Sequence, residues 1–247
     1  MNRYEPFSDQ SLSDFCQDLE FVTCDRSVLT LSARFLQAAG CSMISYVHLP
    51  PPGAADRVQP IGVAAIGYPK DFAKKYILGH LAEHDPMAKA VLELGRPFWW
   101  KERLAGDHLS PDEAEVVNLA LSHGVKGGLA IPVFGPHARN GYVGLGFANV
   151  RTRPTIAQLA RHRIAAQAAH QRYCQVLRQD MSPPRLSTRE REILQLIAAA
   201  KSNAVIADIL SLSINTVDSY VRRIFGKLQV NDRLNCVLRA MALGLIT

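Results

Sequence analysis

The chain has 247 residues, of which 48% are hydrophobic and 20% charged, with a net charge of +6. This composition is typical of a globular protein with room for two domains, and it excludes disordered and fibrous classes. No uncharged apolar run approaches the roughly 18 residues of a membrane helix, and the N-terminus MNRYEPFSDQ lacks the apolar core of a signal peptide. We therefore expect a cytoplasmic protein without a membrane partner.

The positive charge is concentrated near the C-terminus. Residues 183–247 hold nine lysines and arginines against five acids, a balance of +4, which leaves +2 for the longer remainder. Such an excess is expected where a protein meets a polyanion. The five cysteines form no C-x-x-C pair, and their odd number argues against a disulfide framework or a zinc site. We therefore expect reduced, mostly buried thiols and no metal.

The first 180 residues alternate helix and strand signals. Amphipathic spacing, caps and breaks predict helices at residues 11–20, 25–39, 70–81, 85–94, 110–124 and 155–179. Apolar runs bounded by turn residues predict strands at 41–48, 61–67, 97–100, 128–134 and 141–150, the last two joined as a hairpin through GPHARNG. This order predicts an α/β/α sandwich sensor domain over residues 1–178, with room for a small-molecule cavity.

Pro183 and Pro184 end the long helix, because proline cannot donate a helix hydrogen bond, and we assign residues 179–185 to a linker. Short helices are then predicted at residues 188–199, 203–210, 214–228 and 232–243. A tight turn at 211–213 before the third helix is typical of helix-turn-helix proteins. The expected fold class is α+β, with an all-α four-helix domain over residues 186–247 that follows the sensor domain in the sequence.

The third of these helices has two distinct faces. One is an apolar stripe of Val217, Val221, Ile224 and Leu228. The other is polar and mainly basic, and it carries Asp218, Ser219, Arg222, Arg223 and Lys227. Taken alone, this pattern also fits an ordinary solvated helix face.

The elements L-S-x-R-E, K-S-N-x-x-I-A, S-x-x-T-V, K-L-x-V and A-x-x-x-G-L-I follow one another from Leu186 to Ile246. In this the chain resembles the DNA-binding module of the LuxR family. The resemblance implies a scaffold held by Glu190, Leu194, Ile206 and Ala207, and a helix from residue 214 in the major groove. The DNA-binding set that it implies is Lys201, Ser202, Asn203, Thr216, Asp218, Ser219, Arg222, Arg223 and Lys227. Hydroxyls and helix N-termini in this set suit phosphate oxygens, and Arg222 suits a base edge or a phosphate.

The chain departs from the family pattern at two positions of the module. Ala200 replaces the glycine that usually precedes the lysine, so a left-handed backbone there would be strained. Asp218 stands where many relatives carry lysine or arginine. A carboxylate can accept from a cytosine amino group, but it is repelled by a phosphate. We expect the module to fold and to read a target sequence of its own.

Three N-terminal stretches, GYPKDFAKKYILGHLAEHDPM, RPFWWKE and LSHGVKGGLAIPVFGP, are similar to the autoinducer-binding domain of the same family, which senses N-acyl-homoserine lactones. The resemblance implies a pocket lined by Tyr68, Phe72, Tyr76, Asp85, Trp100 and Gly128. In it, Asp85 would accept the amide N–H of the ligand and Tyr76 would donate to the acyl carbonyl. Each residue also has a purely structural interpretation: Asp85 as an N-cap before Pro86, the aromatics as core, and Gly128 as a strand glycine.

Phe72 stands where the family has a tryptophan, whose indole N–H donates to the lactone carbonyl. Loss of that hydrogen bond would cost about 0.5–1.5 kcal/mol, or about tenfold in affinity. The acyl-homoserine lactone therefore remains one candidate ligand. A LuxR-type solo receptor that senses another amide or carbonyl compound, or that acts without ligand, is the alternative.

Other classes of protein are less well supported by the sequence. The eight histidines form no H-E-x-x-H motif, and there is no G-x-S-x-G and no phosphate loop, so we expect neither an enzyme nor a cofactor. A dimer-forming antagonist of another regulator would have an eroded DNA module, whereas this one is complete apart from Ala200. We expect a ligand-responsive transcriptional regulator that binds double-stranded DNA as a homodimer, with RNA polymerase as a further partner.

Overall fold

The computed structural model describes residues 9–57, 63–104, 109–148, 153–179 and 183–246. They form two compact units. One, which we call the sensor, holds helices α1 to α7 and the strands. The other, which we call the module, holds α8 to α11 together with the short 3-10 helix η1 (Ala55–Arg57).

The sensor is built on a five-stranded antiparallel sheet with the order β2-β1-β5-β4-β3. Its strands are β1 (Cys41–Leu49), β2 (Val63–Ile66), β3 (Phe98–Trp99), β4 (Leu129–Phe134) and β5 (Asn140–Phe147). The predicted hairpin is confirmed, since β4 and β5 pair from Leu129–Leu145 to Phe134–Asn140 across the turn helix η3 (Pro136–Ala138).

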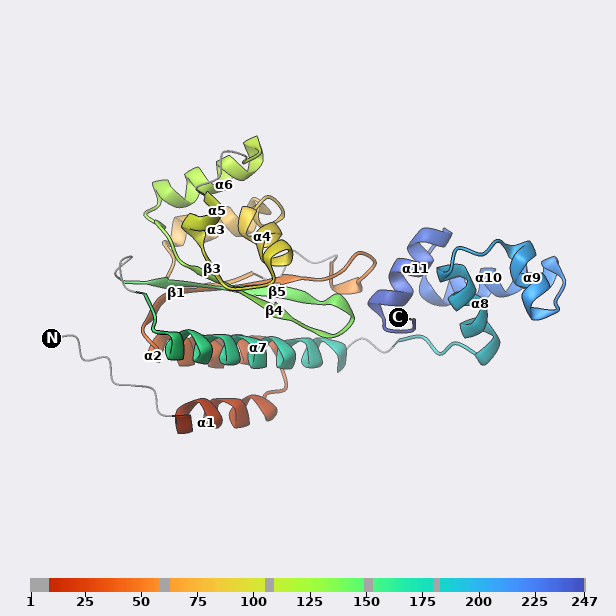
Figure 1. Ribbon diagram of the computed structural model, residues 1–247, viewed down its shortest axis with the longest axis horizontal. Coiled ribbons are helices and arrows are strands. Elements are labelled where there is room, and N and C mark those ends of the chain that lie inside the picture. Colours follow the sequence, from red (N-terminus) through yellow and green to blue (C-terminus); the bar gives the residue numbers. More distant parts are fainter. Residues whose placement is uncertain (1–8, 58–62, 105–108, 149–152, 180–182, 247) are drawn as a thin grey trace. The chain divides into compact units, whose positions relative to one another are not determined.

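Helices cover both faces of this sheet, as the α/β/α prediction required (Figure 1). One face carries α1 (Asp9–Glu20), α2 (Asp25–Ala38) and α7 (Ile156–Gln179). The other carries α3 (Lys70–Leu78), η2 (Leu81–Glu83), α4 (Pro86–Leu94), α5 (Trp100–Leu104) and α6 (Pro111–Ser122). Each face has its own hydrophobic core, so the sheet separates two layers of packed side chains.

Two sensor elements differ most from the sequence prediction, and residues 61–62 and 149–150 of the predicted strands and 180–182 of the predicted linker lie outside the described ranges. The helix expected over residues 70–81 ends at Leu78, because His80 takes a left-handed backbone with φ 52° before η2 begins. The strand expected over residues 97–100 covers only Phe98–Trp99, and Trp100 opens α5. A helix of five residues is too short to show the repeating apolar pattern from which helices were predicted.

The module contains α8 (Thr188–Ala198), α9 (Asn203–Leu210), α10 (Ile214–Leu228) and α11 (Arg233–Ala242). Each begins at a side-chain N-cap, which explains why their first residues could be predicted closely. The caps are Ser187, Ser202, Ser213 and Asp232. The predicted stripe of α10 is buried along its whole length and joins α8 and α9 in one core.

None of the five cysteines, all of which lie in the described ranges, forms a disulfide. Cys41, Cys174 and Cys236 are buried, Cys16 is partly buried and Cys24 is exposed. No single helix of the described ranges is long and apolar enough to cross a membrane; α9 and α10 reach that length and composition only together, with a bend of 111° between them.

Candidate functional site

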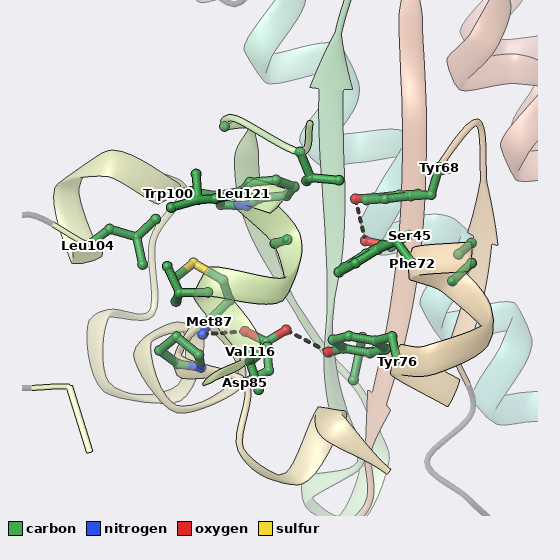
Figure 2. A pocket seen from close by; sticks show the side chains of 18 of the residues that line it. Ser45, Tyr68, Phe72, Tyr76, Asp85, Met87, Trp100, Leu104, Val116 and Leu121 are labelled. Atoms are coloured by element: carbon green, nitrogen blue, oxygen red, sulfur yellow. Dashed lines mark hydrogen bonds between the residues drawn. The ribbon is translucent and has the colours of Figure 1, made fainter. Parts of the chain in front are cut away.

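An apolar cavity of about 90 Å³ lies between the sheet and helices α3 to α6 of the sensor. Five of the six predicted pocket residues line it: Tyr68, Phe72, Tyr76, Asp85 and Trp100 (Figure 2). Gly128 lies beside the ring of Trp100, where a Cβ would come within 2.8 Å of the ring carbon Cζ2. The structure therefore brings the predicted set together around one cavity.

Asp85 has two sets of hydrogen-bond donors. As the N-cap of α4, its Oδ1 accepts from the backbone amide of Met87 at 2.8 Å. Its Oδ2 accepts from the hydroxyls of Tyr76 at 2.6 Å and Tyr142 at 2.5 Å. The cap of α4 and the polar group of the cavity are therefore the same carboxylate.

Burial controls the ionisation of this cluster. It raises the pKa of Asp85, although hydrogen bonds from Tyr142, Tyr76 and the Met87 amide lower it in part. Burial and the neighbouring carboxylate also raise the pKa of Tyr76 and Tyr142 well above the usual value. Both tyrosines are consequently protonated at neutral pH and can act as donors.

The structure gives Tyr76 a partner different from the one that the family resemblance implies. A hydroxyl carries one hydrogen, and that of Tyr76 is directed at Asp85, so in this arrangement it is not available for an acyl carbonyl. Tyr142 and Ser45 also belong to the site and were missed in the sequence. Both lie on predicted strands, but nothing local in the sequence shows that β1 and β5 are neighbours at these positions.

Phe72 forms part of the aromatic wall of the cavity. Its ring lies 5.8 Å from that of Tyr68 and 5.7 Å from that of Tyr76. The side chain is buried and offers no hydrogen-bond donor. Tyr68 directs its own hydroxyl to Ser45 Oγ at 3.2 Å, and burial raises the pKa of Tyr68 to about 12.

Trp100 carries the least satisfied polar group of the cavity. Its indole Nε1 is buried and has no hydrogen-bond partner among the described residues. A buried donor without an acceptor costs about 1–3 kcal/mol, and native proteins contain few of them. The backbone amide of the same residue is satisfied by the carbonyl of Gly128 at 2.9 Å, which anchors the ring at this wall.

In the module, the predicted DNA contact Lys227 is engaged by a buried carboxylate. Its Nζ lies 2.6 Å from Glu190 Oε2 and donates to the carbonyl of Arg185 at 3.1 Å. Glu190 is 3% exposed and closes a capping box with Ser187 at the start of α8. Lys227 thus ties the end of α10 to the start of α8, which is a structural role.

Asn203 and Asp218 also bind each other rather than projecting freely. Asn203 Nδ2 donates to Asp218 Oδ1 at 2.6 Å, which links α9 to α10. Arg233 of α11 donates to Asn203 Oδ1 at 3.0 Å and to the carbonyl of Lys201. The unusual Asp218 therefore has a partner inside the module, where the sequence suggested a cytosine.

Of the remaining predicted residues, Ser202 and Thr216 take part in helix N-caps, and Ser219 forms a hydrogen bond within α10. The side chain of Ser202 caps α9, and Ser213 caps α10 by accepting from the Thr216 amide at 3.1 Å. Ser219 bonds back to the carbonyl of Asn215 at 2.9 Å on the exposed face of α10. These contacts fix the N-termini whose free amides suit phosphate oxygens.

All four cations of the predicted set, Lys201, Arg222, Arg223 and Lys227, are exposed, and Lys227 is the one held by Glu190. The guanidinium of Arg223 lies 5.5 Å from the ring centre of Tyr220, whereas Arg222 lies on the open surface of α10. Ala200 has φ 58°, so the strain predicted for this position applies. These groups leave a small basic surface around the start of α9 and the side of α10.

A second polar network lies under α7, on the opposite face of the sheet. Tyr46 Oη lies 2.8 Å from His170 Nδ1 and 3.3 Å from His48 Nδ1, and His170 Nε2 lies 2.8 Å from the carbonyl of Arg139. Since a carbonyl only accepts, His170 carries its proton on Nε2 and accepts at Nδ1 from Tyr46. Cys174 Sγ lies 3.6 Å from the same Nε2. Although His48, His170 and Cys174 offer ligand atoms within 4.8 Å of one another, hydrogen bonds within the core account for their arrangement.

Known protein families match both units of the chain. Residues 25–173 match the autoinducer binding domain, and residues 184–240 match the bacterial regulatory proteins of the luxR family. The HTH-type quorum sensing-dependent transcriptional regulator RpaR of Rhodopseudomonas palustris is 25% identical over 209 residues, which cover 84% of each chain. The transcriptional activator protein BjaR1 of Bradyrhizobium diazoefficiens is 26% identical over 184 residues, which cover 72% of this chain and 74% of that one.

Among solved structures, that of SdiA from Escherichia coli is similar, with a TM-score of 0.70 and 20% identity over 96% of this chain and 98% of that chain. This likeness supports the fold, an α/β/α domain followed by a helical domain. The autoinducer-binding match spans more than half of the residues, and the luxR match covers most of the module. The chain therefore belongs to the LuxR family of bacterial regulatory proteins and is a ligand-responsive, DNA-binding transcriptional regulator.

Proposed function

We propose that this regulator responds to a small N-acyl amide, with N-acyl-homoserine lactones as the first candidates. The observation that carries the proposal is the partly buried carboxylate of Asp85, which lines an apolar cavity. A carboxylate has about four acceptor positions, and Tyr76, Tyr142 and the Met87 amide occupy three of them. The position left on Oδ1 suits an amide N–H, because a hydrogen bond to a charged acceptor contributes roughly 1.5–3 kcal/mol.

A second candidate is an amide or carbonyl compound without a lactone ring, and Phe72 favours it. The phenyl ring keeps the aromatic wall but cannot donate to a lactone carbonyl. The two candidates share the acyl tail and the N–H group, and they differ at the head group. A sensor that folds without any ligand is the limiting case, and the absence of ligand-induced stabilisation would reveal it.

The proposed output is control of DNA binding by a homodimer. Ligand in the cavity stabilises the folded sensor by about 2.7 kcal/mol at a concentration 100 times its Kd. Two exposed apolar residues, Leu234 and Met241, lie two turns apart on α11 and support contact with a second copy. A dimer would present two recognition helices to two half-sites of double-stranded DNA. We place this action in the cytoplasm, where RNA polymerase is the partner whose access to promoters would change.

The test is the thermal stability of the full chain with and without N-octanoyl-homoserine lactone, together with mass spectrometry of any small molecule that copurifies. Asp85→Asn keeps an N-cap residue but replaces the carboxylate by a carboxamide, so the lactone-induced rise in Tm should largely disappear. Asp232→Asn, at the N-cap of α11, is the matched control and should leave that rise unchanged.

Two outcomes would count against this assignment. If Asp85→Asn lowers Tm equally with and without lactone, the carboxylate is only a cap. Phe72→Trp restores an indole donor and should increase lactone sensitivity by about tenfold. Unchanged sensitivity would favour the compound without a lactone ring.

A further inference from the structure

Trp100 lines the proposed ligand cavity, and its buried indole N–H has no acceptor among the described residues. Figure 2 shows Trp100 and Tyr68 at one end of the cavity, and Asp85 and Tyr76 at the other. The acceptor of the cavity and its unpaired donor are therefore separated by the space that a ligand would occupy.

Two glycines allow the indole to lie close to the sheet. A Cβ at Gly128 would come within 2.8 Å of the Trp100 ring carbon Cζ2, and one at Gly144 would come within 3.3 Å of the same atom. The Cβ position of Gly144 is also 3.6 Å from the hydroxyl of Tyr68, and Ser45 Oγ is closer still. The Trp100 ring, the Tyr68 hydroxyl and Ser45 Oγ therefore all lie close to the Cβ position of Gly144.

The tyrosine hydroxyl hydrogens of the cavity already donate to acceptors of the protein. Tyr76 and Tyr142 donate to Asp85, and Tyr68 donates to Ser45. Phe72 has no donor at all. Among the described residues that line the cavity, the indole N–H of Trp100 is the buried side-chain donor without a protein partner, whereas Lys126, which also lines the cavity, is exposed to solvent.

We propose that Trp100 Nε1–H holds a carbonyl oxygen of the ligand and supplies the polar contact that Phe72 cannot make. The ligand class that fits is a compound with an N–H group for Asp85, a carbonyl for Trp100 and an apolar tail. This inference rests on the ligand binding proposed above and adds the acceptor that the ligand must carry. A water molecule at the indole is the competing occupant, and the experiment separates the two.

The first measurement uses the two tryptophans of the chain, which give two indole signals in the full-length protein labelled with ¹⁵N-tryptophan. Trp99→Phe assigns them. Trp99 serves well as the reference because its ring packs on the other face of the sheet, 6.1 Å from that of Phe147. With N-octanoyl-homoserine lactone bound, the Trp100 indole proton should move downfield as it gains a carbonyl acceptor, while the Trp99 signal stays in place.

The second measurement compares affinities for N-octanoyl-homoserine lactone and for N-octanoyl-cyclopentylamine, which keeps the amide but lacks the lactone carbonyl. Trp100→Phe keeps an aromatic ring and removes the N–H, and it should weaken lactone binding about fivefold to tenfold. Trp99→Phe should leave it unchanged. Equal weakening for both compounds assigns the acyl carbonyl to Trp100, and weakening for the lactone alone assigns the ring carbonyl.

The inference is overturned if the lactone raises Tm while the Trp100 signal stays in place and Trp100→Phe binds like the wild type. Water would then be the partner of the indole, and the proposed ligand binding would stand. If neither compound raises Tm nor shifts any indole signal, the proposed N-acyl amide response fails together with this inference.

Discussion

Each unit of the chain has a carboxylate at the start of a helix, buried at Glu190 and partly buried at Asp85, but the hydrogen-bond partners differ. In the module, Glu190 accepts from the Ser187 amide and from the ammonium group of Lys227. In the sensor, Asp85 accepts from a backbone amide and two tyrosine hydroxyls, all of them neutral. One carboxylate has a counter-ion, and the other has only dipoles.

The pKa values follow from this difference. Burial opposes the ionisation of Glu190, yet hydrogen bonds from Lys227 and Ser187 outweigh it, and the pKa of Glu190 lies below its ordinary value. For Asp85 burial prevails and the pKa is raised. A carboxylate with a counter-ion, such as Glu190, therefore stabilises the fold. A carboxylate without one, such as Asp85 in its cavity, is stabilised most by an additional hydrogen-bond donor, for example a ligand N–H.

The largest effect is expected for Glu190→Ala, which removes the partner of Lys227 and half of the capping box of α8. The free energy of unfolding of the module should fall by about 2–3 kcal/mol. Urea denaturation of the full chain, followed by circular dichroism, measures it. Glu192→Ala is the matched control, because Glu192 is an exposed partner of Arg189 at 2.8 Å, and it should cost about 0.5 kcal/mol or less. Similar losses for the two variants would remove the structural role of Glu190.

Mild acid should weaken the sensor before the module. Burial lowers the pKa of His170 to about 4, against 6.5 for the ordinary side chain. Between these values the unfolded chain binds a proton that the folded sensor does not, so stability falls as pH falls. The loss between pH 7 and pH 5 amounts to about 2 kcal/mol. The contribution of Glu190 persists at these pH values, because its lowered pKa is crossed only in stronger acid.

His170→Gln isolates this effect, since glutamine does not titrate. The difference in Tm between wild type and variant should shrink as pH falls from 7 to 5. Asp85 acts in the opposite sense: its pKa is raised, so its contribution is complete at low pH and is lost as pH rises through that value. A constant difference between wild type and His170→Gln would mean that His170 is not held neutral.

Arg222 and Lys227 test the distinction between exposed and engaged cations on one helix. Arg222→Ala should weaken binding to duplex DNA selected from a random library by about threefold to tenfold, and reduce the salt slope by about 1. Its unfolding free energy should hardly change, because the side chain is exposed. Lys227→Ala should show the reverse, a loss of module stability with a smaller change in the salt slope. DNA binding unaffected by Arg222→Ala would place the interface elsewhere.

The smallest effect concerns Ala200, the residue with φ 58° between α8 and α9. Glycine adopts this backbone without strain, so Ala200→Gly should raise the unfolding free energy by about 0.5–1 kcal/mol. Ala199 has φ −78°, so Ala199→Gly should lower it by a similar amount. Thermal denaturation of the two variants compares them directly. A loss of stability in both would mean that residue 200 is not strained.

The module could be predicted in more detail than the sensor because its signals are local. Ser187 and Glu190 are three residues apart and form a capping box by themselves, and the stripe of α10 follows from spacing alone. The partners of Asp218 and Lys227 could not be predicted, since each lies on another helix. The sequence therefore indicated which residues form the polar face of α10, but not which of them bind other helices of the module.

In the sensor, local signals located the helices and strands, and the family resemblance supplied the pocket residues. Tyr46 and His48 lie two residues apart and therefore on the same face of a strand, and His170 and Cys174 are one helical turn apart. The sequence does not show that these two pairs meet. The same holds for Tyr142, whose hydroxyl reaches Asp85 across 57 positions of the chain. Long-range pairing of this kind depends on the register of the sheet, which no short motif encodes.

The glycines of β5 lower the intrinsic stability of the central strand of the sheet. This central strand carries Gly141, Gly144 and Gly146, and each glycine in a strand costs stability because the unfolded chain is more flexible there. At Gly144 a methyl group would displace Ser45 or Trp100. A side chain at Gly144 would therefore press on residues that line the cavity, so at this one position the intrinsic stability of the strand and the space left for a ligand oppose each other.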